Sequence, residues 1–312
     1  MSAAGGPERG GAAAGPRGGS GSGGAGQGRS AAAAGIGMML LGILMFAVND
    51  TLGKWLVGGY SVGQLLLVRT VAGLLVMAPL ILRTGRGRFR HPPRPRLQLL
   101  RVGLSTAESG LFYWALAGLP LAEGMTYYMA GPVYVAALSP LLLGERVGAR
   151  RWIAVAAGFA GVLLALRPSP ERLTLPALCA VGGSLTYALF LVATRKLAGT
   201  PGTVLMTAQL AGAGLFGGAL VLWQGWTPPG WRDGALMLVL GAGSLAGNLC
   251  VNRSLHLAPA SAVVPFQYTL IVWGVVFGWV VFGDVPDRLT LVGAAVIVGA
   301  GLALLRTGVR PT

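Results

Sequence analysis

The sequence predicts an all-α integral membrane protein with ten transmembrane helices in two inverted five-helix repeats. The first observation behind this prediction is composition. The 312 residues are 54% hydrophobic and 11% charged, whereas soluble proteins average about 25% charged residues. The second is that apolar stretches of about 20 residues, long enough to cross roughly 30 Å of hydrocarbon, recur from Ile36 to the end. The third is an internal repeat.

The internal repeat relates residues 120–167 to residues 259–306. Each copy begins at a proline and continues through a long apolar span to a turn that contains glycine and an acid. A second apolar span, rich in small residues, then ends at an arginine. A fixed period of this kind indicates a repeated architecture. The corresponding residues are Pro120 and Pro259, Gly144-Glu145 and Gly283-Asp284, and Arg167 and Arg306.

The chain divides into a tail and the two repeats, at residues 1–34, 36–167 and 173–307. The tail is rich in Gly, Ala, Ser and Arg and has little apolar surface to bury, so we expect a disordered cytoplasmic segment. A cleaved signal peptide is excluded because the first span is full-length and contains Asp50 and Lys54. The predicted spans are 36–56, 63–82, 98–117, 122–143, 150–167, 173–194, 203–223, 234–254, 260–282 and 289–307.

Lys and Arg residues are unevenly distributed between the loops. If the arginine-rich segment 83–98 is cytoplasmic, alternating spans place 18 of the 24 Lys and Arg residues inside and 5 outside, with Arg69 within a span. Cytoplasmic loops of membrane proteins carry such an excess. We therefore expect a cytoplasmic-membrane protein with both termini in the cytoplasm. Topology also accounts for the net charge of +15 without a nucleic-acid partner.

Five spans per repeat is an odd number, so the second repeat is inverted relative to the first. Inverted repeats are typical of secondary transporters, which bind substrate near the membrane midplane between the repeats. Small residues in the fifth and tenth spans are expected to allow close helix packing. These residues are Ala157, Gly158, Gly161, Gly293, Gly299 and Gly301. Cys179 and Cys250 are expected to be small core residues, with no metal-binding spacing.

The fourth and fifth spans resemble the EamA domain of the drug/metabolite transporter superfamily. The residues that carry this resemblance are Leu119–Glu123, Pro132, Gly144–Arg146, Arg151-Trp152 and Gly158–Val162. The second half resembles the domain more loosely, through Pro259, Pro265-Phe266, Gly283-Asp284 and Pro286-Asp287. The resemblance covers about residues 36–307. It implies ten helices in two inverted repeats and a carrier of small metabolites, such as amino acids and their derivatives.

Two shorter stretches are similar to particular members of that family. Asn49-Asp50 with Lys54, and the ninth span with its PFQY sequence at 265–268, resemble uptake carriers for S-adenosylmethionine or riboflavin. An uptake carrier for such a cofactor, or a polyspecific drug and metabolite exporter, therefore remains an alternative to an amino-acid carrier.

Four ionisable side chains within the spans are candidates for function, because a buried charge costs roughly 2.5–3.5 kcal/mol on insertion scales. They are Asp50, Arg69, Glu108 and Glu123. In the functional interpretation, Glu108 or Asp50 takes up a proton during transport while Arg69 holds an anionic substrate group. In the structural interpretation, Arg69 pairs statically with one of these acids. Asp50 and Lys54 are one helical turn apart, a spacing that allows them to pair along one face of the helix.

Aromatic and amide side chains are expected to line the substrate cavity together with these charges. The candidates are Asn49, Tyr113, Trp114, Tyr128, Asn248, Asn252, Gln267 and Tyr268. Interfacial aromatic belts and helix–helix hydrogen bonds are the competing interpretations. Pro132 and Pro265 lie within spans, where they either break the helix and expose carbonyls to a substrate or kink it.

Several other functions are disfavoured. The chain has two histidines and lacks the HExxH and GxSxG motifs of hydrolases and a phosphate-binding loop for ATP. A membrane enzyme or a channel is thus a distant alternative, and no cofactor or metal is predicted. The expected partners are a small-molecule substrate, the lipid bilayer and protons as the coupling ion.

Overall fold

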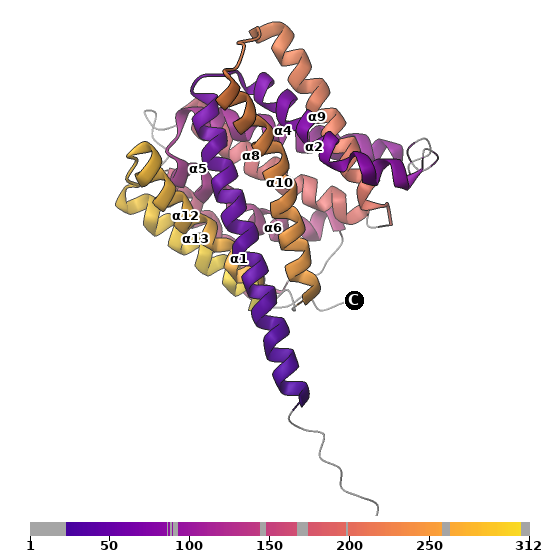
Figure 1. The fold of residues 1–312 in the computed structure, drawn as a ribbon. Helices are drawn as coiled ribbons and strands as arrows, with labels where there is room; N and C mark the ends of the chain where they lie inside the picture. The colour runs from indigo at the N-terminus through magenta and orange to yellow at the C-terminus, as the bar shows by residue number, and fades with distance from the viewer. Residues whose placement is uncertain are drawn as a thin grey trace, which may run out of the picture.

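The computed structural model describes residues 23–85, 87, 89, 93–143, 148–166, 174–197, 199–257 and 263–306, and within these residues every regular element is a helix. Figure 1 shows the helices gathered into one bundle, with the N-terminal part of α1 extending beyond it. The first half contains α1 (Gly23–Val57), α2 (Val62–Thr84), α4 (Pro95–Gly118), α5 (Leu121–Tyr128), α6 (Gly131–Leu143) and α7 (Ala149–Leu166).

The second half repeats this order of elements. It contains α8 (Leu175–Lys196), α9 (Gly202–Gln224), α10 (Trp231–Leu257), η1 (Val264–Tyr268), α12 (Thr269–Phe277), η2 (Gly278–Phe282) and α13 (Arg288–Arg306). Within the part of the chain that the structure describes, five helices are individually long and apolar enough to cross a membrane, namely α1, α2, α8, α9 and α10. The ten predicted spans each coincide with one helix or with a run of shorter helices, which confirms the predicted fold class.

Part of the segment predicted to be disordered, residues 23–34, is helical in the structure. Helix α1 begins at Gly23 and runs through this segment into the first span. The alanine run before the span explains the difference, because alanine has the highest intrinsic helix propensity. The remainder of the tail, the turn predicted at 144–146, and Pro259 lie outside the described residues.

Helices of opposite halves pack against each other along their lengths. The main contacts join α1 with α10, α4 with α8, α2 with α9, and α7 with α13. Exchanging the two repeats turns the α1–α10 pair into the α8–α4 pair and leaves the other two pairs unchanged. The contacts therefore have the two-fold symmetry of an inverted repeat.

Three of these helix pairs cross at facing glycines. The pairs are Gly42 with Gly247, Gly63 with Gly217, and Gly161 with Gly293. In each pair, a Cβ atom on the first glycine would lie 3.0 Å from the carbonyl oxygen of the second. Such close backbone approach is the usual source of helix association in lipid, where hydrophobic burial offers little. The prediction of close packing by small residues is confirmed for Gly161 and Gly293, whereas Gly299 faces open space.

The fourth and ninth spans are both interrupted at matching positions. In the fourth, α5 ends at Tyr128 and α6 begins at Gly131, one residue before Pro132. Proline has no N–H to donate to the carbonyl four residues earlier, so the helix stops at that carbonyl. In the ninth, the 3₁₀ helix η1 gives way to α12 after Tyr268, which corresponds to Met129 in the repeat. The prolines therefore accompany breaks rather than simple kinks.

Loops expected on one side of the membrane meet in the structure. At one end, here called the Lys54 end, the Gln64 side-chain amide exchanges two hydrogen bonds with the Thr227 backbone, at 2.7 and 3.1 Å. Nearby, Tyr60 donates to Asp233 at 2.7 Å, and this bond raises the pKa of Tyr60. At the opposite end, Arg94 donates to the Lys196 carbonyl at 3.0 Å. These contacts agree with the predicted alternation of span directions.

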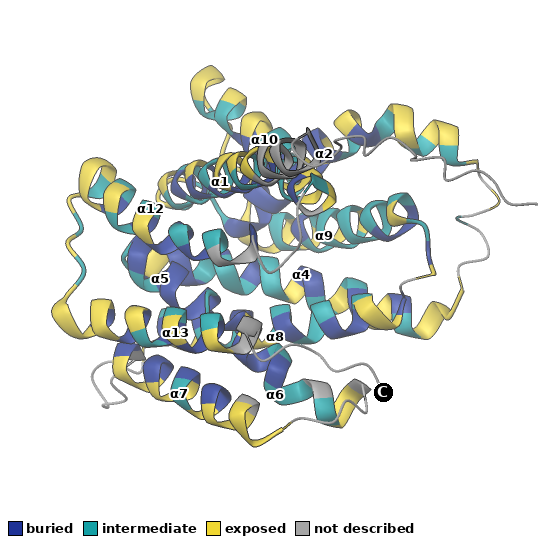
Figure 2. Ribbon diagram, turned by 90° about the horizontal axis from the view of Figure 1, so that it is seen from below, coloured by how far each residue is buried: buried dark blue, intermediate teal, exposed yellow. Residues whose placement is uncertain are grey.

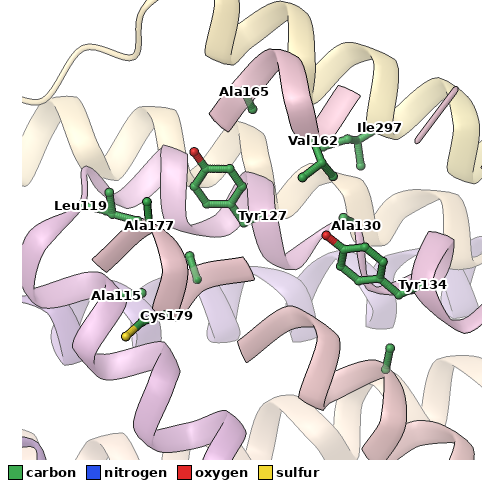
Figure 3. Packing of buried hydrophobic residues seen from close by; sticks show 12 residues of the cluster. Ala115, Leu119, Tyr127, Ala130, Tyr134, Val162, Ala165, Ala177, Cys179 and Ile297 are labelled. Carbon is green, nitrogen blue, oxygen red and sulfur yellow. The ribbon is translucent and has the colours of Figure 1, made fainter. Parts of the chain in front are cut away.

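The interior is built from small residues and the exterior is apolar. Figure 3 shows one buried cluster in which alanines, Cys179, Tyr127 and Tyr134 pack between helices of both halves. The expectation that Cys179 is a core residue is thereby confirmed. Buried residues face the middle of the bundle, and its outward faces are exposed (Figure 2). Those faces carry large apolar side chains such as Leu222, which is 91% exposed, as lipid contact requires.

Adding one methyl group at Gly293 should destabilise the protein. In Gly293→Ala, the new Cβ would meet Gly161 O at 2.7 Å and Ala165 N at 2.8 Å, both backbone atoms. We expect a loss of about 1–3 kcal/mol, the usual cost of overpacking, seen as a lower thermal midpoint in detergent. Gly299→Ala on the same helix meets nothing within 4 Å and serves as the control. Equal midpoints for the two variants would contradict the crossing.

Candidate functional site

Arg69 lies in α2 at a junction of the two halves. Its guanidinium donates to the Tyr113 hydroxyl of α4 at 2.7 Å and to the Ser244 hydroxyl of α10 at 3.5 Å. Its Cζ atom lies 5.4 Å from the centre of the Tyr113 ring. Within the described part of the chain, no carboxylate lies at ion-pair distance from Arg69. Since a guanidinium has five N–H donors, further donors are left for a ligand.

Two acids share this region without contacting Arg69 directly. Asp50 of α1 and Glu108 of α4 are both half-buried and lie close enough to interact electrostatically with Arg69 and with each other. Ser109 donates a hydrogen bond to the Glu108 carboxylate at 3.2 Å. The predicted set of Asp50, Arg69 and Glu108 is thus gathered in one place. The static ion pair of the structural interpretation is not formed.

Asn49 contributes a buried acceptor beside this group. Its side chain is 6% exposed, and its Oδ1 atom has no hydrogen-bond partner. A Cβ atom at Gly243 of α10 would lie 3.4 Å from that oxygen, and Gly243 directly precedes Ser244, the partner of Arg69. Buried polar atoms are almost always paired. The unpaired oxygen is therefore an acceptor whose hydrogen-bonding capacity is unused in this structure.

Two tyrosines hold α4 in position around the acids. Tyr113 is fully buried, and its ring fills the space in front of Gly53, where a Cβ would lie 2.7 Å from Cε1. Tyr128, at the end of α5, donates to the backbone carbonyl of Glu108 at 3.3 Å. Its ring meets Phe112 edge-on at 4.7 Å. The break in the fourth span thus places Tyr128 against the acid-bearing turn of α4.

Lys54 does not pair with Asp50, although the spacing of the two residues along α1 allows it. Its ammonium donates to the carbonyl of Leu119 and lies 3.7 Å from the Asp284 carboxylate. A spacing of one helical turn permits a pair along one helix, but the side chain instead reaches across to the other half. The position of the Lys54 ammonium is set by two contacts outside α1. One is the Asp284 carboxylate, and the other is the Leu119 carbonyl at the C-terminal end of α4.

Several other candidates lie away from Arg69. Trp114 lines a groove of about 550 Å³ with Thr106 and Phe216. The hydroxyl of Tyr268 sits against Gly301 of α13. Glu123 accepts from Tyr127 at 3.0 Å in the first turn of α5. The remaining three are Gln267, which is half-buried in η1, and Asn248 and Asn252, which are exposed on α10.

Sequence reasoning did not single out Ser244, Tyr187 or the contacts of Arg101. Tyr187 of α8 lies within electrostatic reach of Glu108. The run of small residues around Ser244 was the available signal, because such runs mark close helix contact. Arg101, in the second turn of α4, is buried at 4% exposure. It is held by three hydrogen bonds of 2.8–3.1 Å, to Thr194, Leu205 and Gln209.

Comparison with known proteins shows which family shares this architecture. The profile of the EamA-like transporter family matches the chain twice, over residues 33–167 and 174–307. A solved crystal structure matches with a TM-score of 0.59 and 21% identity, covering 88% of this chain and 96% of the other. At that identity the likeness supports the fold alone.

Curated relatives extend over most of the chain. A riboflavin transporter of Vibrio cholerae is 28% identical over 83% of this chain and 89% of its own length. An S-adenosylmethionine uptake transporter of Rickettsia felis is 23% identical over 86% and 92%, respectively. A pseudopaline exporter of Pseudomonas aeruginosa is 25% identical over 86% and 95%.

The position of Tyr128 can be tested with a substitution in α8, the helix that lies against its hydroxyl. In Gly183→Ala, the new Cβ would lie 2.1 Å from the Tyr128 hydroxyl, so the tyrosine must leave the Glu108 carbonyl. We expect the thermal midpoint to fall by the equivalent of about 1–3 kcal/mol. Adding Tyr128→Phe, which removes the hydroxyl, should restore part of the loss.

The neighbouring Gly182→Ala is the matched control, since its Cβ would have only Leu111 Cδ1 nearby, at 3.8 Å. Failure of Tyr128→Phe to recover any stability would show that the hydroxyl is not the source of the conflict.

Proposed function

The chain belongs to the EamA-like transporter family, and we propose that it is a secondary transporter that moves a small metabolite across the cytoplasmic membrane by alternating access. The supporting observation is the position of Arg69. Its guanidinium bonds Tyr113 of the first half and Ser244 of the second. Inverted-repeat transporters bind substrate where the repeats meet, and these contacts lie at such a place.

Amino acids and their derivatives suit the chemistry around Arg69. A substrate carboxylate would satisfy the guanidinium, because paired N–H donors match the geometry of a carboxylate. A substrate ammonium would have Asp50 or Glu108 as its counter-charge, and an N–H group would satisfy the unpaired Asn49 oxygen. A zwitterionic head group thus finds a partner for each of its charges.

A cofactor carrier is the alternative supported by the relatives. Two of the three described above transport riboflavin or S-adenosylmethionine, and the third is an exporter. S-Adenosylmethionine carries an amino-acid head and would use the same charges. Riboflavin has no carboxylate. Arg69 would therefore donate hydrogen bonds to its neutral polar groups, and the Asn49 oxygen would accept one from them.

Proton coupling through Glu108 or Asp50 completes the proposal. Each acid is half-buried and near Arg69, but neither is locked to it by an ion pair. An acid without a fixed counter-ion can take up and release a proton as its surroundings change, which is what a proton relay within a membrane requires.

Replacing Arg69 should weaken ligand binding. A thermal-shift screen of the detergent-purified protein would include amino acids, S-adenosylmethionine, riboflavin and nucleosides. A ligand at about 100 times its Kd stabilises the folded state by roughly 2.7 kcal/mol. For a ligand found in this way, Arg69→Lys should weaken Kd by roughly 10- to 100-fold, the effect of losing a hydrogen bond to a charged group.

Arg232→Ala, at an exposed arginine beside Trp231, is the control and should keep full affinity. Unchanged affinity in Arg69→Lys would remove Arg69 from the site. Hits confined to neutral cofactors would favour the cofactor carrier over the amino-acid carrier.

The coupling acids can be identified in proteoliposomes. Transport of the screened ligand would be driven by an imposed pH gradient in both directions. We expect Glu108→Gln or Asp50→Asn to abolish the response to the gradient while exchange without a gradient persists, because the amide cannot carry the proton. Asp233→Asn, which changes an acid bonded to Tyr60 at the Lys54 end, should respond normally. A full response in both test variants would end the proton-coupling proposal.

A further inference from the structure

Lys54 connects three segments from the two halves. It projects from the last turn of α1 and donates to the carbonyl of Leu119, where α4 ends. Its ammonium also lies 3.7 Å from the Asp284 carboxylate and 5.1 Å from the centre of the Phe282 ring. This ion pair lies between partly buried side chains, which are 14% exposed for Lys54 and 32% exposed for Asp284. It joins the first half to the loop between the last two spans.

A hollow lies beside this ion pair. Its volume is about 350 Å³, and it is lined by Lys54, Trp55, Gly58, Leu116, Ala117 and Phe282. We call Arg69, Asp50, Glu108 and Tyr113 the Arg69 region. On both α1 and α4, a residue that lines the hollow lies about one helical turn from a member of this region. On α1, Lys54 follows Asp50 by one turn, and on α4, Leu116 follows Tyr113 by about one turn. The hollow therefore lies about one helical turn from Asp50 and Tyr113, on the side of the Lys54 end.

Asp284 is presented by irregular backbone. The five residues before Gly283 form a π-helix, and Gly283 adopts φ 71°, a left-handed conformation that glycine accepts without strain. The Asp284 N–H then bonds the carbonyl of Gly278 at 2.9 Å. Single π-turns are rare and occur frequently at functional sites. A segment of this kind can rearrange more readily than a regular helix end.

We propose that Lys54 and Asp284 are gating residues, whose ion pair closes the path between the Arg69 region and the outer surface. This inference rests on the proposed transport function and on the predicted topology, which makes the Lys54 end the outer side. Ion pairs with partly exposed side chains contribute little to stability. The pair can therefore break and re-form within a transport cycle, and its loss shifts the protein toward the state that is open at this end.

Accessibility of Leu116 reports on this gate without any substrate. The side chain lines the hollow and is 1% exposed, so Leu116→Cys, in a background with Cys179→Ala and Cys250→Ala, should react slowly with a water-soluble maleimide. In lipid nanodiscs, Asp284→Asn and Lys54→Gln should each accelerate labelling by roughly two- to fivefold, the shift that loss of such a pair allows. Asp284→Glu, which keeps the charge, should remain slow.

Asp233→Asn is the matched control. It removes an acid at the same end of the protein, but this acid contacts Tyr60 and not Lys54. Labelling in Asp284→Asn at the parent rate, or equal acceleration in Asp233→Asn, would overturn the proposal. Gel filtration identifies any variant that fails to fold. Asp284→Asn and Lys54→Gln remove opposite partners of the same ion pair, so either variant alone tests the proposal if it is well folded. Because no ligand is used, this result is independent of the substrate class and of proton coupling.

Discussion

Close contact between the backbones of opposite halves is the constraint on which the rest of this structure depends. In lipid, apolar side chains gain little by leaving their surroundings, so helices associate where small residues let them approach. Here α1 meets α10, α2 meets α9, and α7 meets α13 at facing glycines. Each contact joins a helix of one repeat to a helix of the other. The two repeats are therefore interleaved layers of one bundle rather than adjacent domains.

This interleaving explains why the polar residues gather as they do. Arg69 on α2 can reach Tyr113 on α4 and Ser244 on α10 because the glycine contacts bring these helices together. At Gly241 of α10, a Cβ atom would lie only 2.4 Å from the carbonyl oxygen of Arg69. The charged site is thus a consequence of the same packing that stabilises the bundle. A change at a glycine far from any substrate can displace it.

The sequence was sufficient to predict the spans, because length and hydropathy of a membrane helix are set by the bilayer. It also identified Asp50, Arg69 and Glu108, since charges in apolar spans are rare and conspicuous. It could not determine which helix faces which. In the structure the acid beside Lys54 comes from the other half, and the exposed Asn248 donates to the Ser244 carbonyl on its own helix. Ser244 was missed because a single serine among glycines carries no charge and little hydropathy signal.

The interleaved halves also bear on how the protein is made. Chains emerge from the ribosome N-terminus first, so α1, α2 and α4 enter the bilayer before α8, α9 and α10 exist. Until the second half arrives, Arg69 lacks Ser244, and the glycine faces of α1 and α2 have no helix to meet. The last contacts of Arg69 and of these glycine faces therefore form only after the second half has been inserted.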